Sequence, residues 1–290
     1  MAAKINAVDL FRKGPYNGMY DFDRSETIVF TEADNDAYVL KGCSLELRAK
    51  IELVGNVVIR AWKPGTKAPD AVGVGRAGLD GGDGGNGTNS GHGGDGGRGA
   101  DGAEGPAGGD GADAGHIKLK IEGVDGTGKL RVIANGGDGG AGGEGGKGGA
   151  GGNGGAGSDA SCPNYDGSHG STGRNGGNGG DGGNGGRGGH GGRAGNGGNI
   201  SYWSRLQPFI DSHVIELISE PGQEGSGGRG GFGGRGGGRG SMGHGKNCGI
   251  WGEFPGGHNG ADGAHRETVQ SDTGRPGPRG SRGFTGCFDC

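Results

Sequence analysis

The last four residues, Cys-Phe-Asp-Cys, place Cys287 and Cys290 at the CxxC spacing found in many metal sites. Together with His244 and Cys248 of the earlier stretch HGKNC, they could form a Cys3His zinc site. A complete zinc motif normally has two close pairs of ligands, so we favour a chain without a metal or another cofactor. The five cysteines are an odd number and do not indicate a disulfide framework, although a Cys248–Cys287 disulfide in an oxidising medium is an alternative.

A second chemically suggestive stretch is GGRGGFGGRGGGRG, residues 227–240. Taken alone it is an RGG box, and such segments bind RNA through arginine charge and stacking. The glycine phase is unbroken from Gly222 to Gly243, which favours an ordered rod instead. Arg229, Phe232 and Arg235 would then form a regular stripe on one side of the rod, and that stripe is a candidate ligand or partner face.

Three short loops carry aromatic residues that could contact a partner. They are CPNYDG (162–167), SYW (201–203) and GIWGEF (249–254). The candidate contact residues in these loops are Tyr165, Tyr202, Trp203, Trp251 and Phe254.

Catalytic chemistry has little support in the sequence. Neither GxxxxGK[ST] nor a GxGxxG that opens a helix after a strand is present, so no phosphate loop is predicted. The glycine–aspartate runs lack the large apolar residue of calcium-binding nonapeptides. His92, His116 and His190 lie among Asp and Arg, where we expect a solvated surface. No nucleophile–base pair stands out, and we expect no enzyme.

Composition limits the kind of core that this chain can build. Of 290 residues, 86 are glycine and only 28% are hydrophobic, against roughly 45–50% in ordinary soluble domains. The net charge of −4 does not favour a dedicated nucleic-acid binder. No apolar stretch of about 18 residues predicts a membrane helix. No secretory signal peptide is evident at the start, so we expect synthesis in the cytoplasm and action outside the cell or on a virion.

The glycine runs keep a strict period of three. In 136–157 two of every three residues are glycine, and the third position, here called the display position, carries a side chain: Asp138, Ala141, Glu144, Lys147, Ala150, Asn153 and Ala156. A flexible linker needs no such phase. The period predicts a glycine version of the polyproline II helix, in which two bare faces let neighbouring backbones bond and the third faces water. Run 80–116 keeps one nearly strict glycine class, with Ser90 the exception, and is predicted at an edge. Run 274–286 keeps one glycine in three and is predicted as an outer rod, with a collagen-like piece as the alternative.

Apolar segments alternate with the glycine runs. Residues 44–62, 116–135 and 200–222 each read as two extended pieces joined by a turn such as VDGTGK, although 211–219 could equally be a short helix. We predict a mainly β and irregular fold, a short-stranded sheet or β-solenoid with inserted polyglycine-II helices packed as a two-layer sandwich. The predicted division is an N-terminal β region at 1–64 and a glycine-rich region at 65–290, interrupted at 116–135 and 200–222.

The size of the fold predicts where the glycine runs turn. A compact 290-residue domain is about 50 Å across, so the run 80–116 must reverse. The irregular stretches GTNSG (87–91) and GAEGPAGG (102–109) are the expected turns.

The array NGGNGGDGGNGGRGGHGG, within 175–191, resembles those of the polyglycine-II proteins. The nearest functional analogue is the receptor-binding tip adhesin of T-even-like phage tail fibres. That resemblance implies stacked glycine rods with receptor-binding loops at one end. GGAGGNGGAG (148–157) also resembles mycobacterial PGRS arrays. Snow-flea antifreeze proteins use the same rod, but the charged display positions here disfavour ice binding.

We therefore expect a non-enzymatic structural or binding protein, an adhesin-like scaffold that presents loops to a surface or receptor. The first alternative is a self-assembling extracellular filament or matrix subunit stacked through its rods. The second is an RGG-type RNA-binding protein. The expected partners are a cell-surface receptor or other copies of the chain, in an oligomer or a larger assembly, without membrane insertion and without nucleic acid.

Overall fold

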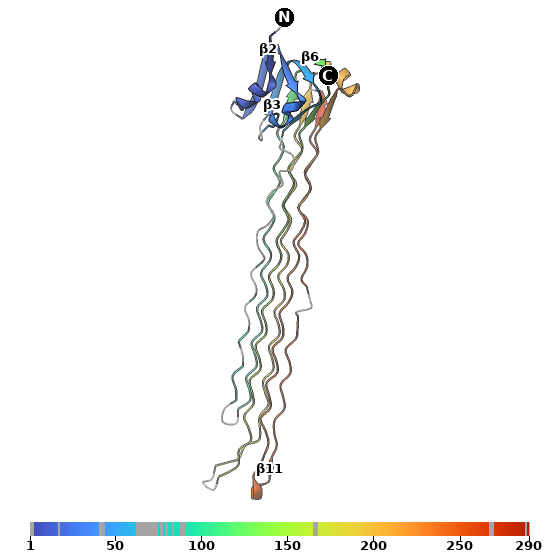
Figure 1. The fold of residues 1–290 in the computed structure, drawn as a ribbon. Coiled ribbons are helices and arrows are strands. Elements are labelled where there is room, and N and C mark those ends of the chain that lie inside the picture. Colours follow the sequence, from blue (N-terminus) through green and yellow to red (C-terminus); the bar gives the residue numbers. More distant parts are fainter. Residues whose placement is uncertain are drawn as a thin grey trace.

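The molecule is elongated, with a strand-rich head at one end and a long stalk of glycine-rich chain (Figure 1). The computed structural model describes residues 3–16, 18–40, 44–61, 75, 78, 81–82, 84–87, 91–164, 168–266, 270–287 and 289. The fold is mainly β and irregular, as predicted. The compact shape inferred from chain length is wrong, because the glycine runs stay extended along a common axis instead of folding back on the head.

Two parallel sheets build the head. The larger one has the order β1 (Lys4–Asn6), β2 (Met19–Thr31), β3 (Ser44–Val54), β5 (Ile117–Leu119), β8 (Ile200–Tyr202) and β12 (Thr285–Cys287), with β6 (Gly123–Gly126) also pairing with β3. The smaller one has the order β4 (Val57–Arg60), β7 (Leu130–Ile133) and β9 (Ile215–Ile218). Strands from 1–64 and from both interruptions of the glycine region therefore share these sheets.

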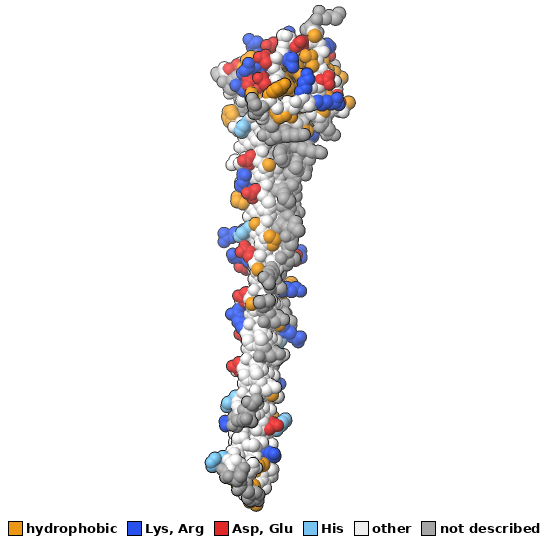
Figure 2. Space-filling model, turned by 90° about the vertical axis from the view of Figure 1, so that its left-hand side faces the viewer, with side chains coloured by type: hydrophobic (Ala, Val, Ile, Leu, Met, Phe, Trp, Pro, Cys, Tyr) orange, Lys and Arg blue, Asp and Glu red, His pale blue; other side chains and the backbone are white. Residues whose placement is uncertain are grey.

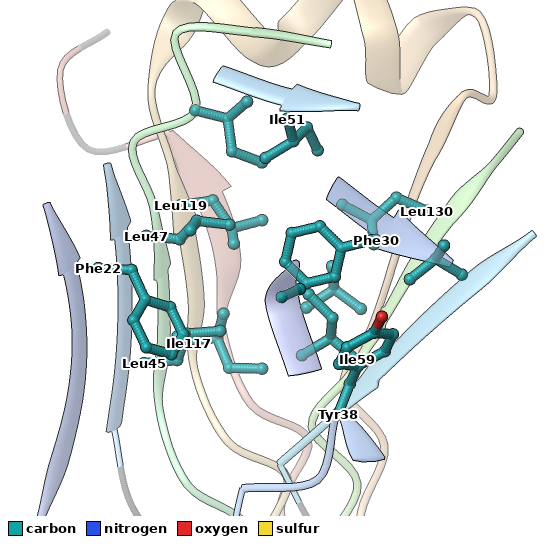
Figure 3. Close-up of a cluster of buried hydrophobic side chains, with 14 of the residues drawn as sticks. Phe22, Phe30, Tyr38, Leu45, Leu47, Ile51, Ile59, Ile117, Leu119 and Leu130 are labelled. Atoms are coloured by element: carbon teal, nitrogen blue, oxygen red, sulfur yellow. The ribbon is translucent and has the colours of Figure 1, made fainter. Parts of the chain in front are cut away.

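The core of the head lies between the two sheets (Figure 3). Strand β3 alternates buried and less buried residues, so that Leu45, Leu47 and Ile51 point inward, as period two requires. Phe30 packs against Tyr38 with ring centroids 5.1 Å apart, and both side chains are fully buried. The scattered apolar segments thus gather into one core.

Short helical elements complete the head. Helix α1 (Ala7–Arg12) starts where the Asn6 side chain accepts a hydrogen bond from the N–H of Val8, and it buries Leu10 and Phe11. A 3-10 helix, η1 (Glu32–Ala37), connects β2 to the next segment. A second one, η2 (Ser204–Leu206), leads into helix α2 (Gln207–Asp211).

Strand pairing within each apolar segment differs from the prediction. The two pieces around VDGTGK do not form a hairpin, because β5 joins the larger sheet and β7 the smaller one. Each strand pairs in parallel with the equivalent strand of another segment, as Ile117 does with Ile200. The helical alternative for 211–219 is also wrong, since α2 ends at Asp211 and β9 occupies Ile215–Ile218.

Six glycine-rich segments form the stalk. They are segment 1 (75–87), segment 2 (91–115), segment 3 (136–157), segment 4 (173–199), segment 5 (222–243) and segment 6 (256–283), described except for the gaps given above. Segments 1, 3 and 5 run away from the head as one layer, and segments 2, 4 and 6 return as the other. Segments of one layer are parallel to each other and antiparallel to those of the other layer.

Backbone hydrogen bonds hold the segments together in steps of three residues. The N–H of Gly145 in segment 3 donates to the carbonyl of Arg229 in segment 5 of the same layer, at 2.8 Å. The next N–H, of Gly146, donates to the carbonyl of Ala103 in segment 2 of the opposite layer, at 2.8 Å. These two bonds repeat along the stalk, so in most triplets of segment 3 two of the three backbone N–H groups have a hydrogen-bond acceptor.

The closeness of neighbouring backbones explains why these positions are glycine. A Cβ atom placed on Gly183 would lie 2.0 Å from the carbonyl oxygen of Ala100, closer than any side chain tolerates. The same contact recurs along the inner faces of the stalk. Glycine is thus required by sterics rather than by an unusual backbone angle.

A ladder of side chains pairs many of the remaining N–H groups, and the sequence analysis did not predict it. The carboxylate of Asp95 accepts from the N–H of Asn178 at 2.7 Å, and the side chain of Asn178 accepts from the N–H of Ala261 at 2.9 Å. These capping side chains stand at display positions, and each accepts an N–H from the neighbouring segment of the same layer. In segments 2 and 4 they are His92, Asp95, Asp101, Asp110, Asp113, His116, Asn175, Asn178, Asp181, His190, Asn196 and Asn199.

Three histidines belong to this ladder, a role beyond the solvated surface that the sequence predicts. The Nδ1 atoms of His92, His116 and His190 each accept a backbone N–H of the next segment. The imidazole rings remain exposed, but each has a defined hydrogen-bonding partner.

The ladder also changes the acidity of two carboxyl groups. Donation from the backbone N–H of Asn184 lowers the pKa of Asp101, and donation from the N–H of Asn196 lowers the pKa of Asp113. In both cases the hydrogen bond favours the charged form. A nearby arginine, Arg98 or Arg193, adds to the effect.

Only one of the two predicted turns reverses the chain. Segments 1 and 2 run in opposite directions on either side of GTNSG, as the bond from Gly94 to Gly85 requires. The turn predicted at 102–109 is wrong, because the N–H groups of Gly102, Gly105 and Gly108 continue the same ladder into segment 4. Within the described part of the chain, no helix has the length and apolarity to cross a membrane.

Candidate functional site

The aromatic and arginine candidates lie in three separate places. Tyr202 and Trp203 belong to the head, the stripe of 229–235 lies on the stalk, and Trp251 and Phe254 lie at the distal tip, the end farthest from the head. Tyr165 falls outside the described residues. No single surface therefore unites the candidates, and each place is considered by itself.

Two loops meet at the distal tip. One, residues 158–173, connects segments 3 and 4, and the other, residues 244–256, connects segments 5 and 6. Cys162 and Cys248 join them through a disulfide with a Cα–Cα distance of 5.4 Å. This pairing differs from the Cys248–Cys287 alternative, since Cys287 lies in β12 of the head.

Further contacts fix the two loops against each other. The carboxylate of Asp159 accepts the N–H of His244 at 2.8 Å, and the N–H of Gly173 donates to the carbonyl of Pro255 at 2.8 Å. The ring of Phe254 lies against Gly170, where a Cβ atom would come within 2.7 Å of it. Phe254 is therefore half-buried and supports the tip rather than facing outward.

The second loop presents apolar side chains to solvent. A two-stranded ribbon, β10 (Lys246–Asn247) with β11 (Glu253–Phe254), frames the 3-10 turn η3 (Gly249–Trp251). Gly249 and Gly252 have φ angles of 62° and 81°, which suit glycine. Ile250 is 82% exposed and Trp251 41% exposed. An exposed apolar pair on a covalently held turn suits contact with another molecule.

The suggested zinc ligands do not come together. His244 and Cys248 lie at the tip and Cys287 in the head, while Cys290 lies outside the described residues. Cys248 is already engaged in the disulfide. Among the residues described, no three His, Cys, Asp or Glu side chains are placed to hold a metal ion.

The head candidates mainly support packing. Tyr202 packs against the core, and its hydroxyl donates to the side chain of Gln207 at 2.8 Å. The N–H of Trp203 bonds to the carbonyl of Leu119 at 3.1 Å, and the guanidinium of Arg205 lies 6.0 Å from the indole. These contacts leave the two aromatic residues little freedom to rearrange around a ligand.

The stripe on segment 5 is fully displayed. Arg229, Phe232 and Arg235 are all exposed, and Phe232 retains 45% of its accessible surface. Segment 5 donates to segment 4 and accepts from segments 3 and 6, so the stripe has a rigid base. Figure 2 shows charged side chains along both margins of the stalk, together with scattered hydrophobic ones.

The sequence analysis missed Cys162 and Ile250 as parts of the tip. No local pattern marks Cys162, because its pairing depends on the lateral register of segments 3 and 5, which bond at an offset of 85 residues, as Asp138 and Gln223 do. Cys162 and Cys248 are 86 residues apart, one more than this offset, so the pairing of segments 3 and 5 brings them close. Ile250 belongs to the GIWGEF loop, and its exposure became visible only with the turn η3 in which it lies.

Comparisons with known proteins give little further guidance. No model of a known protein family and no curated protein matches this chain. Among solved structures, a springtail antifreeze protein from Granisotoma rainieri, described as a bundle of nine polyproline type II helices, is 22% identical. The match covers 77% of this chain and 96% of that one, with a TM-score of 0.10.

Proposed function

We propose that this protein is a non-enzymatic, adhesin-like scaffold that holds a receptor-binding tip at the end of a stiff stalk. The observation that carries the proposal is the position of the disulfide-held turn, with Ile250 and Trp251 exposed, at the end farthest from the head. A surface or receptor is the partner that such a turn can reach. The disulfide suits an oxidising setting outside the cell or on a virion.

In this proposal the six stalk segments are polyglycine-II helices packed as a two-layer sandwich. Three observations support it: the period of three in the hydrogen bonds, the glycine-only inner faces, and the bonds between segments rather than within them. Such a lattice would make the stalk stiff without an apolar core. The likeness to receptor-binding tip adhesins of T-even-like phage fibres, suggested by the GGX arrays, belongs to the same proposal.

The ends of the capping ladder favour discrete particles over laterally growing filaments. Segments 5 and 6 have no further described neighbour in their own layers. Among the display positions of segments 5 and 6 that the hydrogen bonds define, the acceptors of the Asn, Asp or His type are His258 and Asp272, both in segment 6. The others are Gln223, Ser226, Arg229, Phe232, Arg235, Gly238, Ser241, Ala261, Ala264, Arg275, Pro278 and Ser281. A copy that extended either layer would find few capping side chains there.

Part of the open edge of segment 5 is also closed from within. Its outward N–H groups at Gly236, Arg239 and Met242 are capped by segment 6 side chains, namely His265 at 3.2 Å, Asp262 at 2.9 Å and Asn259 at 2.9 Å. Unpaired backbone groups at an edge can bind the edge of another copy of the chain, and capped groups cannot. The filament alternative therefore has less support than the adhesin.

The test compares two double variants in binding to a panel of cell surfaces and immobilised glycans. Ile250→Ser with Trp251→Ser should reduce binding at least about tenfold, a loss of roughly 1.4 kcal/mol or more. The control is Tyr16→Ser with Phe284→Ser, because these side chains are 80% and 64% exposed but lie in or beside the head. Equal binding by the two variants would contradict a receptor-binding tip.

Electron microscopy of the same proteins tests the assembly state. We expect single rods of uniform length, each with a head at one end. Side-by-side sheets or fibres of the unmodified protein would contradict the adhesin and support the filament.

A further inference from the structure

We propose that the segment 5 side of the stalk binds an extended anionic polysaccharide, one that carries sulfate or phosphate groups. This interaction is distinct from the proposed binding by the tip. The surface consists of Arg229, Phe232, Arg235 and Arg239 of segment 5 and Lys147 of segment 3, and we call it the basic stripe. All five side chains are exposed.

The basic stripe is continuous across two segments. The N–H of Gly148 donates to the carbonyl of Phe232 at 2.8 Å, so Lys147 stands beside Phe232 in the same layer. Arg229 and Arg235 flank Phe232 along segment 5. At about 3.1 Å per residue, the two arginines are roughly 19 Å apart. Cations on two adjacent rows thus surround one exposed aromatic ring.

The positive charges of the basic stripe outnumber the negative charges beside it. Glu144 stands beside Arg229, because the N–H of Gly145 donates to the carbonyl of Arg229, and the carboxylate of Asp262 accepts the N–H of Arg239 at 2.9 Å. Among the described residues, none of Arg229, Arg235, Arg239 and Lys147 forms an ion pair. Like charges that lack partners raise the local potential and attract anions.

Arginines on the opposite layer behave differently. There the guanidinium of Arg98 lies 3.0 Å from Asp101, that of Arg193 lies 3.2 Å from Asp113, and that of Arg187 lies 3.4 Å from Asp272. These three paired arginines contrast with Arg229, Arg235 and Arg239, although Arg275 of segment 6, in the same layer as the paired arginines, also forms no ion pair with a described residue.

The geometry of the basic stripe selects the chemistry of its ligand. The planar guanidinium group offers a fork of N–H donors that matches sulfate and phosphate oxygens. A straight, rigid row suits a linear polymer, because no part of the backbone needs to rearrange. Phe232 gives one ring against which a sugar face can pack.

A single-stranded nucleic acid fits less well. Proteins that bind such strands stack successive bases on several aromatic side chains. The basic stripe offers one aromatic ring, so it can hold charge along its length but can stack at a single point. We therefore assign the anionic polysaccharide, and the oligonucleotide becomes an arm of the test.

The experiment measures heparin affinity as a function of salt, with the full chain and two matched triple variants. Arg229→Gln, Arg235→Gln and Arg239→Gln together should weaken heparin binding about tenfold or more and make the salt dependence shallower. The control, Arg98→Gln, Arg187→Gln and Arg193→Gln, removes the same charge from the opposite layer and should change the affinity less than about threefold.

Three outcomes would overturn the proposal. The first is equal weakening by both triple variants, which would show attraction to net charge alone. The second is tighter binding of a 20-nucleotide oligothymidine than of heparin at the same salt. The third is no heparin binding by a protein whose thermal melt is intact. The Ile250→Ser, Trp251→Ser variant should bind heparin normally, so failure of the tip proposal and failure of this one are distinguishable.

Discussion

The head and the stalk are made from one chain and one arrangement of layers, but different groups hold each of them together. In the head, buried side chains such as Phe30, Leu47 and Ile59 fill the space between two sheets. In the stalk, the inner faces carry almost no side chain, and the contact is backbone against backbone. Strands β5 and β8 continue directly from segments 2 and 4, so the change of contact occurs within continuous layers.

This difference shows that the spacing of glycines along the sequence, rather than the hydrophobicity of side chains, can specify an ordered structure. The hydrogen-bonding offset of 83 residues between segments 2 and 4 persists into the head, where Ile117 pairs with Ile200. The head uses side-chain alternation to define which face is buried, and the stalk uses glycine spacing for the same purpose. Predictions about the two regions should therefore respond to different substitutions.

The largest effect is expected from Phe30→Ala in the head. Phe30 is fully buried and packs against Tyr38 and Phe11, so its removal leaves a cavity that should cost about 3–5 kcal/mol. Chemical denaturation and native-state amide exchange measure the loss. Exchange should quicken mainly in β3 and β7, while amides of segments 3 and 4 keep more of their protection.

The matched control is Tyr16→Ala, since that side chain is 80% exposed and should change stability by less than about 0.5 kcal/mol. If Phe30→Ala quickens amide exchange equally in head and stalk, the two regions unfold as one cooperative unit. That result would contradict the expectation that the head and the stalk are stabilised independently.

A smaller but more specific effect is expected from two adjacent glycines in segment 5. A Cβ on Gly237 would lie 1.9 Å from the carbonyl of Gly152, whereas one on Gly238 meets only the side chain of Asn153, at 3.3 Å. Gly237→Ala should therefore push two segments apart and leave backbone N–H and carbonyl groups without partners. The free energy of unfolding should fall by at least about 2–3 kcal/mol. Gly238→Ala should stay within about 1 kcal/mol of the unmodified protein.

Thermal melts of the two alanine variants test whether stability depends on the position of a glycine within the triplet or only on the number of glycines. Both variants replace one glycine by one alanine in the same segment, so composition is identical. Equal melting temperatures would contradict a stalk held by its glycine faces and would leave the head as the only ordered region.

The parts of the fold that sequence could predict are those that depend on local period. Alternation predicts the inward side chains of β3, and the triplet phase marks Gly237 as an inner position. The strand pairing of β5 and β7 was not predictable, because VDGTGK favours a hairpin locally while lateral stacking of the segments decides the partners. Ala103 and Pro106 suggested a turn, but they face solvent at an edge, where glycine is not required.

The site was predictable only in outline. The aromatic loop GIWGEF pointed to the tip, while the disulfide required the lateral offset between segments 3 and 5. Asn, Asp and His recur visibly at the display positions, yet their role depends on which N–H lies one segment away. Such long-range registers are absent from any local pattern.

The third prediction concerns the capping ladder of the stalk. The carboxylate of Asp95 accepts the N–H of Asn178 at 2.7 Å. Asp95→Ala should cost about 0.5–1.5 kcal/mol, as loss of a comparable helix cap does, whereas Asp95→Asn keeps an acceptor and should cost less. Denaturant titration of the two variants measures the difference. Equal losses would show that charge, rather than hydrogen bonding to the backbone, is what Asp95 contributes.

The smallest effect is a dependence of stalk stability on pH. Backbone N–H donation lowers the pKa of Asp101 and of Asp113 in the folded protein. A carboxyl group whose pKa is lower when folded stabilises the fold above its unfolded pKa, and this contribution disappears as the pH falls through the folded value. Stability should therefore decline as the pH drops below about 4, where unfolded aspartate begins to bind protons.

Replacing both residues with asparagine keeps the acceptor oxygens but removes the titration, so the double variant should lose less of its melting temperature between pH 7 and pH 3. Glu46 in the head, whose pKa is lowered chiefly by its hydrogen bond with Lys120, titrates in both proteins and serves as the internal reference. An unchanged pH dependence in the double variant would show that acid acts on the head and not on the capping ladder of the stalk.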